Sequence, residues 1–158
     1  MTMAQATLKN ELIAMNLYDT EADAITALTG AWKNYFTDAV TNALSIQSAV
    51  LNPAKSAMAT AMTGLSITGA VAIQAGIIAW WGYLVSVATT AFTGCTLITP
   101  PTTLTGIVSA LTPVFVNNIV HSLSEANAYD AIATVLHTNN LGGLATIPPP
   151  PGTTYPIL

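Results

Sequence analysis

The chain has 158 residues, of which 52% are hydrophobic and 6% charged, and its formal net charge is −4. Only three residues are Lys or Arg, so the basic surface that nucleic-acid binding requires is missing and no nucleic-acid partner is expected. The length corresponds to one ordinary domain. Ten charges cannot cover the surface of a monomer of this size, so we expect part of that surface to be buried between subunits.

The first third of the chain predicts two helices. Residues 4–15 place Leu8 and Leu12 on one face of a short amphipathic helix. Thr20 is expected to cap the second helix, because acidic residues follow where the helix dipole favours them. This helix is predicted to run to about Leu44. Its apolar residues recur at helical intervals, which indicates a core stripe rather than an aromatic ligand site: Ile25, Leu28, Trp32, Tyr35, Phe36 and Ala39.

The middle of the chain holds its most apolar segment. Asn52 and Pro53 predict the start of a third helix, because Asn caps helices and Pro suits the first helical position. The uncharged stretch 69–92 follows, between the charged residues Lys55 and Glu125. Apolar residues occupy all sides of this stretch, which predicts a fully buried helix.

Two adjacent tryptophans, Trp80 and Trp81, lie in the middle of this stretch. Neighbouring helical residues point about 100° apart, so we expect one indole to face the core and the other a second layer or another subunit. Both are therefore candidate interface residues. The stretch is also long enough to span a membrane. Central tryptophans do not form an interfacial belt, however, and no Lys or Arg cluster flanks the stretch, so we expect burial in protein.

The last third of the chain predicts an extended connector, two helices and an arm. Residues 97–103 contain consecutive prolines, which favour extended backbone. A helix is expected over residues 104–120. Ser122 and Glu125 have the spacing of a capping box at the start of the final helix.

Residues 144–158 predict an extended C-terminal arm that follows a helical domain at 1–143. Four consecutive prolines favour polyproline II, which has no internal hydrogen bonds. The arm ends in apolar residues that gain free energy on burial. We expect it to rest on a neighbouring subunit through its candidate interface residues, Tyr155, Ile157 and Leu158. The predicted fold class is all-α, a bundle of about five helices with an extended Pro-rich C-terminal arm.

Patterns that carry chemistry are missing from the sequence. His121 and His137 have no Cys, Asp or Glu partner at metal-ligand spacing. No G-x-S-x-G elbow, P-loop or dinucleotide fingerprint occurs. Cys95 is the only cysteine and is interpreted as a small buried hydrophobe. We therefore expect no catalytic residue, no cofactor and no metal, and a small enzyme or binding module is the least favoured reading.

Four stretches together resemble small uncharacterised virion structural proteins of tailed bacteriophages. They are LKNELIAMNLYDTEADAITALTGAWKNYF, the ITPP connector, DAIATVLHT and the ending GGLATIPPPPGTTYPIL. The resemblance covers most of the chain and supplies no functional residues. It implies a non-enzymatic structural subunit of the capsid, neck or tail, located in the virion, whose partners are copies of itself and other virion proteins. The alternative is a membrane-embedded, holin-like protein with a span at 69–92.

Overall fold

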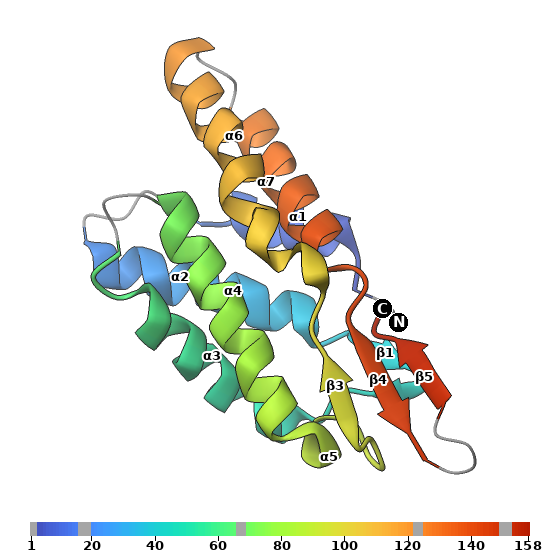
Figure 1. Cartoon of the computed structure of the whole chain (residues 1–158). Coiled ribbons are helices and arrows are strands. Elements are labelled where there is room, and N and C mark those ends of the chain that lie inside the picture. Colours follow the sequence, from blue (N-terminus) through green and yellow to red (C-terminus); the bar gives the residue numbers. More distant parts are fainter. Residues whose placement is uncertain (1–2, 16–19, 66–68, 122–124, 149–152) are drawn as a thin grey trace.

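The computed structural model of the chain is mainly helical (Figure 1). Within the described residues, seven α-helices and five short strands alternate along the sequence. The described residues are 3–15, 20–65, 69–121, 125–148 and 153–158, with the side chains of 117–126 excepted. The helices are α1 (Gln5–Ile13), α2 (Glu21–Phe36), α3 (Ser48–Met62), α4 (Gly69–Ser86), α5 (Ala88–Ala91), α6 (Ile107–His121) and α7 (Glu125–Asn140).

The helices pack in a connected bundle with α4 near its centre. Helix α4 packs against α3 and α6, and α3 also packs against α2. Helix α1 lies between α2 and α7, and α7 also packs against α6. Leu8 and Leu12 are buried as predicted, which fixes α1 on this bundle.

Helix α2 begins as predicted and ends earlier than predicted. The Thr20 hydroxyl oxygen accepts a hydrogen bond from the Asp23 backbone N–H at 3.2 Å. The helix ends at Phe36 rather than near Leu44, because the chain then forms a hairpin. Strands β1 (Val40–Thr41) and β2 (Leu44–Ser45) pair across a two-residue turn. Both turn residues, Asn42 and Ala43, have positive φ, at 45° and 63°, as this type of hairpin turn requires.

Helix α3 begins at Ser48, so the prediction of a start at Asn52 and Pro53 is wrong. Val50 and Leu51 are 2% and 4% exposed, and their burial accounts for the earlier start. Pro53 lies in the N-terminal half of α3. It has no backbone N–H, so the helix lacks one hydrogen bond at this position.

Helix α4 also ends earlier than predicted, at Ser86 rather than Phe92. Val87 leaves the helical conformation, with φ −122° and ψ 30°, and separates α4 from the short α5. Gly94 has a φ of +81°, which fits its predicted role as a terminator after the helical stretch.

A three-stranded antiparallel sheet corrects the all-α prediction. Its strands are β3 (Leu97–Thr99), β4 (Leu144–Ile147) and β5 (Thr153–Pro156), in the order β3-β4-β5. Ile98 pairs with Ala145 in the centre of the sheet. The connector before the ITPP prolines is extended as predicted, and it is part of this sheet.

The C-terminal residues pack on their own chain, so the prediction of an arm lying on a neighbouring subunit is wrong for the described part of 144–158. Ile157 N–H donates to the Gly143 carbonyl at 2.8 Å. Leu158 and Val40 exchange two backbone hydrogen bonds, both at 2.9 Å. The Ile157 side chain is fully buried.

Proline positions explain this correction. The residues of the proline run that precede β5, 149–151, lie outside the described part of the chain. Strand β5 itself contains one proline, Pro156, and is an edge strand, where a missing N–H is tolerated. The remaining residues of β5 keep their donors, so a ladder with β4 can form.

Helix α6 follows a short 3₁₀ helix, η1 (Thr102–Gly106). The predicted capping box at Ser122 lies outside the described residues. The helical period of the α7 sequence predicts that Ala128, Ile132, Val135 and Leu136 face inward. The structure buries Ala128 and Leu136, and Ile132 and Val135 are partly buried against the core. Helix α7 ends at Asn140, and Gly142 follows with a φ of +94°, a backbone conformation that favours glycine.

Candidate functional site

The inner side of α4 carries both tryptophans. Trp80 is 0% exposed and Trp81 is 1% exposed. Phe36, the last residue of α2, packs its ring on both indoles. Its ring centroid lies 5.0 Å from that of Trp80 and 5.7 Å from that of Trp81. Trp32 and Tyr35 complete this aromatic cluster, and both are fully buried.

These burial values show that neither indole faces another subunit in this conformation. Of the two predicted alternatives the second layer fits, because Trp81 faces Asn140 of α7. Helix α4 is covered by α3 on one side and by α6, η1 and β3 on another, so two adjacent residues fit inside the same chain. Trp81 packs so closely on Gly143 that a Cβ there would collide with the indole ring. Neither Trp80 nor Trp81 reaches the surface, so neither can contact a partner in this conformation.

The outer face of α4 (Val71, Ala75, Ile78, Gly82 and Val85) corrects the prediction of burial on all sides. Val71, Ile78 and Val85 are 39%, 42% and 37% exposed. Ala75 is partly buried and Gly82 is exposed. These five positions follow one another at intervals of four and three residues, so they form one straight stripe along the helix.

The outer face alternates small and large apolar residues. A Cβ built on Gly82 would meet no atom within 4 Å, so the open space there is larger than a methyl group needs. Sequence reasoning expected the whole stretch 69–92 to be buried, Ile78 and Val85 included. The regular alternation of Ala75 and Gly82 with the three branched residues is the signal in the sequence that marks this side as separate.

Charged side chains lie away from the outer face. Between Lys55 and Glu125 the sequence has no Asp, Glu, Lys or Arg, so α4, α5, η1 and α6 carry none. The Lys55 Nζ lies 3.8 Å from the position that a Cβ on Gly30 of α2 would occupy, so this ammonium is directed toward α2. Lys9 and Asp130 pair at 3.0 Å between α1 and α7.

A polar cluster borders the aromatic residues inside the bundle. The Trp81 indole N–H donates to the Asn140 Oδ1 at 2.8 Å. The Tyr35 hydroxyl and the His137 Nδ1 are hydrogen-bonded at 2.7 Å. Burial raises the pKa of Tyr35 to about 12, and the Asn140 side chain opposes this rise. Burial lowers the pKa of His137 below its ordinary value, so the neutral imidazole is favoured.

This cluster is suited to positioning α7 against α2 and α4. His137 is partly buried and its Nδ1 is hydrogen-bonded to the Tyr35 hydroxyl. The Cys95 thiol is fully buried and donates to the Leu97 carbonyl at 3.2 Å. Burial raises the pKa of Cys95, which disfavours the reactive thiolate.

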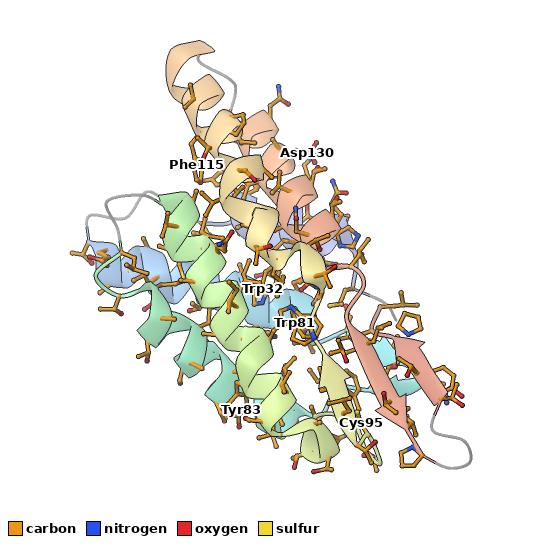
Figure 2. The ribbon with its side chains drawn as sticks, viewed as in Figure 1. Trp32, Trp81, Tyr83, Cys95, Phe115 and Asp130 are labelled. Atoms are coloured by element: carbon orange, nitrogen blue, oxygen red, sulfur yellow. The ribbon has the colours of Figure 1, made fainter. Side chains whose placement is uncertain are left out.

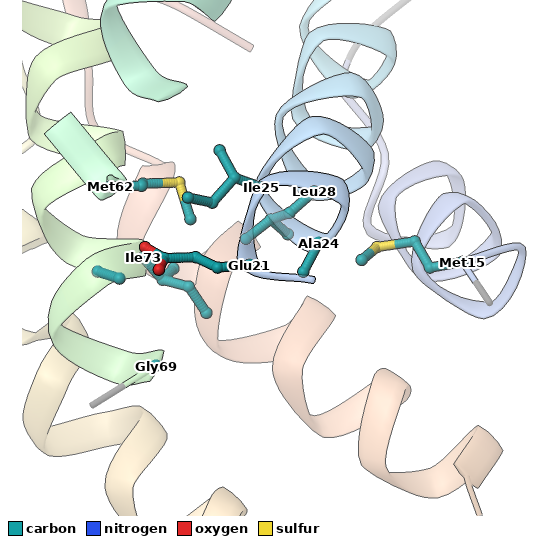
Figure 3. A pocket seen from close by; sticks show the side chains of 9 residues that line it. Met15, Glu21, Ala24, Ile25, Leu28, Met62, Gly69 and Ile73 are labelled. Atoms are coloured by element: carbon teal, nitrogen blue, oxygen red, sulfur yellow. The ribbon is translucent and has the colours of Figure 1, made fainter. Parts of the chain in front are cut away.

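An apolar cavity of about 250 Å³ opens where α2, α3 and α4 meet (Figure 3). Glu21 is the one charged residue among the described residues that line it, and a Glu21 carboxylate oxygen accepts a hydrogen bond from the Gly64 backbone N–H at 2.8 Å. The remaining described lining residues are Met15, Ala24, Ile25, Leu28, Met62, Gly69, Ala72 and Ile73. Such a wall can receive an apolar group.

The remaining candidate interface residues lie at the C-terminal end of the chain. Tyr155 is partly buried in β5, Ile157 is fully buried, and Leu158 is 44% exposed. Figure 2 labels Trp81 on α4. Its ring packs on Gly143, whose carbonyl accepts the Ile157 N–H. The structure therefore brings Trp81 close to the end of the chain inside the protein, but it does not gather the five predicted interface residues on one surface, because Trp80, Trp81 and Ile157 are buried.

Two searches of the described residues bear on other functions. They contain no group of three or more His, Cys, Asp and Glu side chains that could hold a metal ion. Helix Gly69–Ser86 is long and apolar enough to cross a membrane, with a mean hydropathy of 1.4, and 44% of it is buried inside the protein. Comparisons with protein-family models, curated proteins and solved structures found no match.

Proposed function

We propose that this chain is a non-enzymatic structural subunit of a multi-copy assembly, a capsid, neck or tail component of a bacteriophage virion. The observation that carries the proposal is the outer face of α4, where Val71, Ile78 and Val85 are each more than a third exposed. Exposed apolar side chains aligned on one helix mark a surface that another protein covers.

The charge distribution supports the same function. A uniform, uncharged face can be covered by many identical subunits without bringing like charges together, although each copy has a net charge of −4. The resemblance of the sequence to phage structural proteins supports a virion as this assembly. The aromatic cluster and the C-terminal strands give each copy a rigid core on which such a face can be built.

The test is the composition of purified particles. We expect the protein to co-purify through a density gradient with particles of the phage that encodes it, at a fixed copy number per particle measured by quantitative mass spectrometry. A map of the intact particle should then show α4 covered by another chain. Absence of the protein from washed particles would overturn the proposal.

A membrane-embedded, holin-like role is the second candidate, because Gly69–Ser86 has the length and hydropathy of a span. Insertion would require α4 to leave its contacts with α3 and α6 and to expose both tryptophans to lipid. Flotation with lipid vesicles, followed by a carbonate wash, distinguishes the two functions. A spanning protein floats with the vesicles and resists extraction by carbonate, whereas a virion subunit stays with the particles.

A further inference from the structure

We propose that the outer face of α4 binds the same face of a second copy of this chain, with the two helices antiparallel. The inference rests on the proposed function, and it names the partner of that face. The residues that carry it are Val71, Ala75, Ile78, Gly82 and Val85, which lie on one side of α4 and are exposed except for the partly buried Ala75.

The size pattern of the outer face determines the direction of the pair. The stripe contains two interleaved sets, one of branched residues (Val71, Ile78, Val85) and one of small residues (Ala75, Gly82). In an antiparallel pair centred between Ile78 and Gly82, residue 78 of one copy faces residue 82 of the other, and residue 85 faces residue 75. Each of these contacts joins a branched residue to a small one. Ile78 then fills the open space at Gly82, and Val85 packs on Ala75.

A parallel pair fits less well. It would place Ile78 against the Ile78 of the second copy and Gly82 against Gly82, so that crowded layers alternate with empty ones. Protein interfaces pack at the density of protein interiors, and large-against-small packing meets that requirement without moving the backbone. Gly82 has no atom within 4 Å of its Cβ position, so the space is available.

Charge favours a second copy over a partner with a charged surface. The outer face offers no ionised group, and the sequence between Lys55 and Glu125 has none. A charged partner would lose solvation on this face without gaining a pair. A second copy presents an equally uncharged face and keeps the acidic residues of α2 away from the contact.

The area of the contact indicates how the pair is used. Two 18-residue helices touching along their length, each about 27 Å long and 10 Å wide, bury roughly 500 Å² in total. That is less than half of the roughly 1,200 Å² at which stable interfaces begin. The isolated pair is therefore weak, and it becomes stable where other contacts of a multi-copy assembly hold the copies together.

Disulfide trapping tests the pairing and its direction. Ala75→Cys and Val85→Cys should give a mixed disulfide when the two variants are combined at high concentration, with one of them mass-tagged. Each variant alone should give none, because residue 75 of one copy lies about 15 Å along the helix from residue 75 of the other. Disulfides need Cα atoms within about 7 Å. The unsubstituted chain, whose Cys95 is buried, is the control.

The outcomes separate this inference from the proposed function. Self-linking of each variant without mixed linking would mean a parallel pair and overturn the inference. If neither the mixed nor the self-linked disulfide forms, but the protein is present in particles, the self-pairing is overturned and the proposed structural function is not affected. Absence from particles would remove the function, whatever the links show.

A second measurement does not depend on cysteine chemistry. Ile78→Asp should raise the dissociation constant of the dimer at least tenfold in sedimentation equilibrium, because it buries a carboxylate in an uncharged contact. Ile13→Asp is the matched control, since Ile13 on α1 is 41% exposed and Ile78 is 42% exposed. It should change the constant less than twofold. Equal effects of the two substitutions would contradict the proposed contact.

Discussion

The two ends of the helix pair α2 and α4 are filled very differently. The first turns of both helices line the cavity, through residues such as Ala24, Gly69 and Ala72. Later turns of the same two helices carry the aromatic cluster, in which Trp32 and Trp80 are fully buried. We refer to these regions as the cavity end and the aromatic end.

The difference between the ends shows how residue volume, rather than hydrophobicity, sets packing. Both ends are apolar, but the cavity end mixes the small residues Ala24, Gly69 and Ala72 with flexible or branched aliphatic side chains and has no aromatic ring among its described lining residues. The aromatic end contains five rings, and Phe36 alone contacts Trp32, Tyr35, Trp80 and Trp81 with centroids between 5.0 and 5.7 Å. We expect the aromatic end to dominate the free energy of unfolding.

The largest expected effect is at Trp81. Trp81→Ala should lower the free energy of unfolding by about 3–5 kcal/mol, because it leaves a large hole, and it also leaves the Asn140 Oδ1 without its indole donor. Urea denaturation followed by circular dichroism measures this loss. Trp81→Phe is the control that keeps most of the ring, and its cost should be clearly smaller. A cost below about 1 kcal/mol for Trp81→Ala would show that the aromatic end is not dominant.

Removing the last two residues should have the next largest effect. Deletion of Ile157 and Leu158 exposes the site that Ile157 fills, which costs about 1.5–3 kcal/mol. It also breaks the backbone hydrogen bonds to Gly143 and Val40. Leu158→Ala, which keeps the backbone, should cost much less. Thermal unfolding compares the two, and a deletion with no effect on the midpoint would contradict the packing of this tail.

A matched pair of substitutions tests the contrast in packing directly. Ala72→Leu fills the cavity end and should be neutral or stabilise the chain by up to about 1 kcal/mol. Ala39→Leu introduces the same side chain near Phe36, where Ala39 is 0% exposed, and overpacking should cost about 1–3 kcal/mol. Chemical denaturation of both variants gives the sign. Equal destabilisation would mean that the cavity end is already filled.

The smallest expected effect is on pH dependence, and two residues at the aromatic end, His137 and Tyr35, contribute to it. Because burial lowers the pKa of His137, the unfolded chain binds a proton more readily. Stability should therefore be full at neutral pH and decrease as pH falls below about 6.5. The raised pKa of Tyr35, about 12, predicts a second decrease above about pH 10. His137→Gln should flatten the acid slope, and Tyr35→Phe the alkaline one, in denaturation series across pH.

Sequence reasoning found the features of this fold that depend on local signals. The Thr20 cap, the burial of both tryptophans and the inward residues of α7 follow from periodicity and capping, and the structure confirms them. The hairpin of β1 and β2 is local, but its turn residues Asn42 and Ala43 carry no glycine to signal it. The contacts that fix the three-stranded sheet and the end of the chain were missed because they join distant segments. Val40 pairs with Leu158, and Ile98 with Ala145, and no pattern within a short window contains that information.

The candidate site was harder to predict for a related reason. The stretch 69–92 is apolar on all sides, so hydropathy alone could not tell which residues the rest of the chain would cover. That choice depends on where α3, α6 and the sheet pack. The alternation of Ala75 and Gly82 with branched residues was visible, but its meaning requires the knowledge that this side stays open.

The pairing of Val40 with Leu158 also sets an order of events during synthesis. The hairpin at residues 40–45 is made early, yet its backbone partner is made more than a hundred residues later. Ile157 must emerge from the ribosome before the core can close around it. Until then the aromatic rings of α2 and α4 lack part of their cover, so nascent chains close together on one message expose the same apolar surfaces to one another. Rapid folding once Ile157 has emerged therefore protects the chain from aggregation.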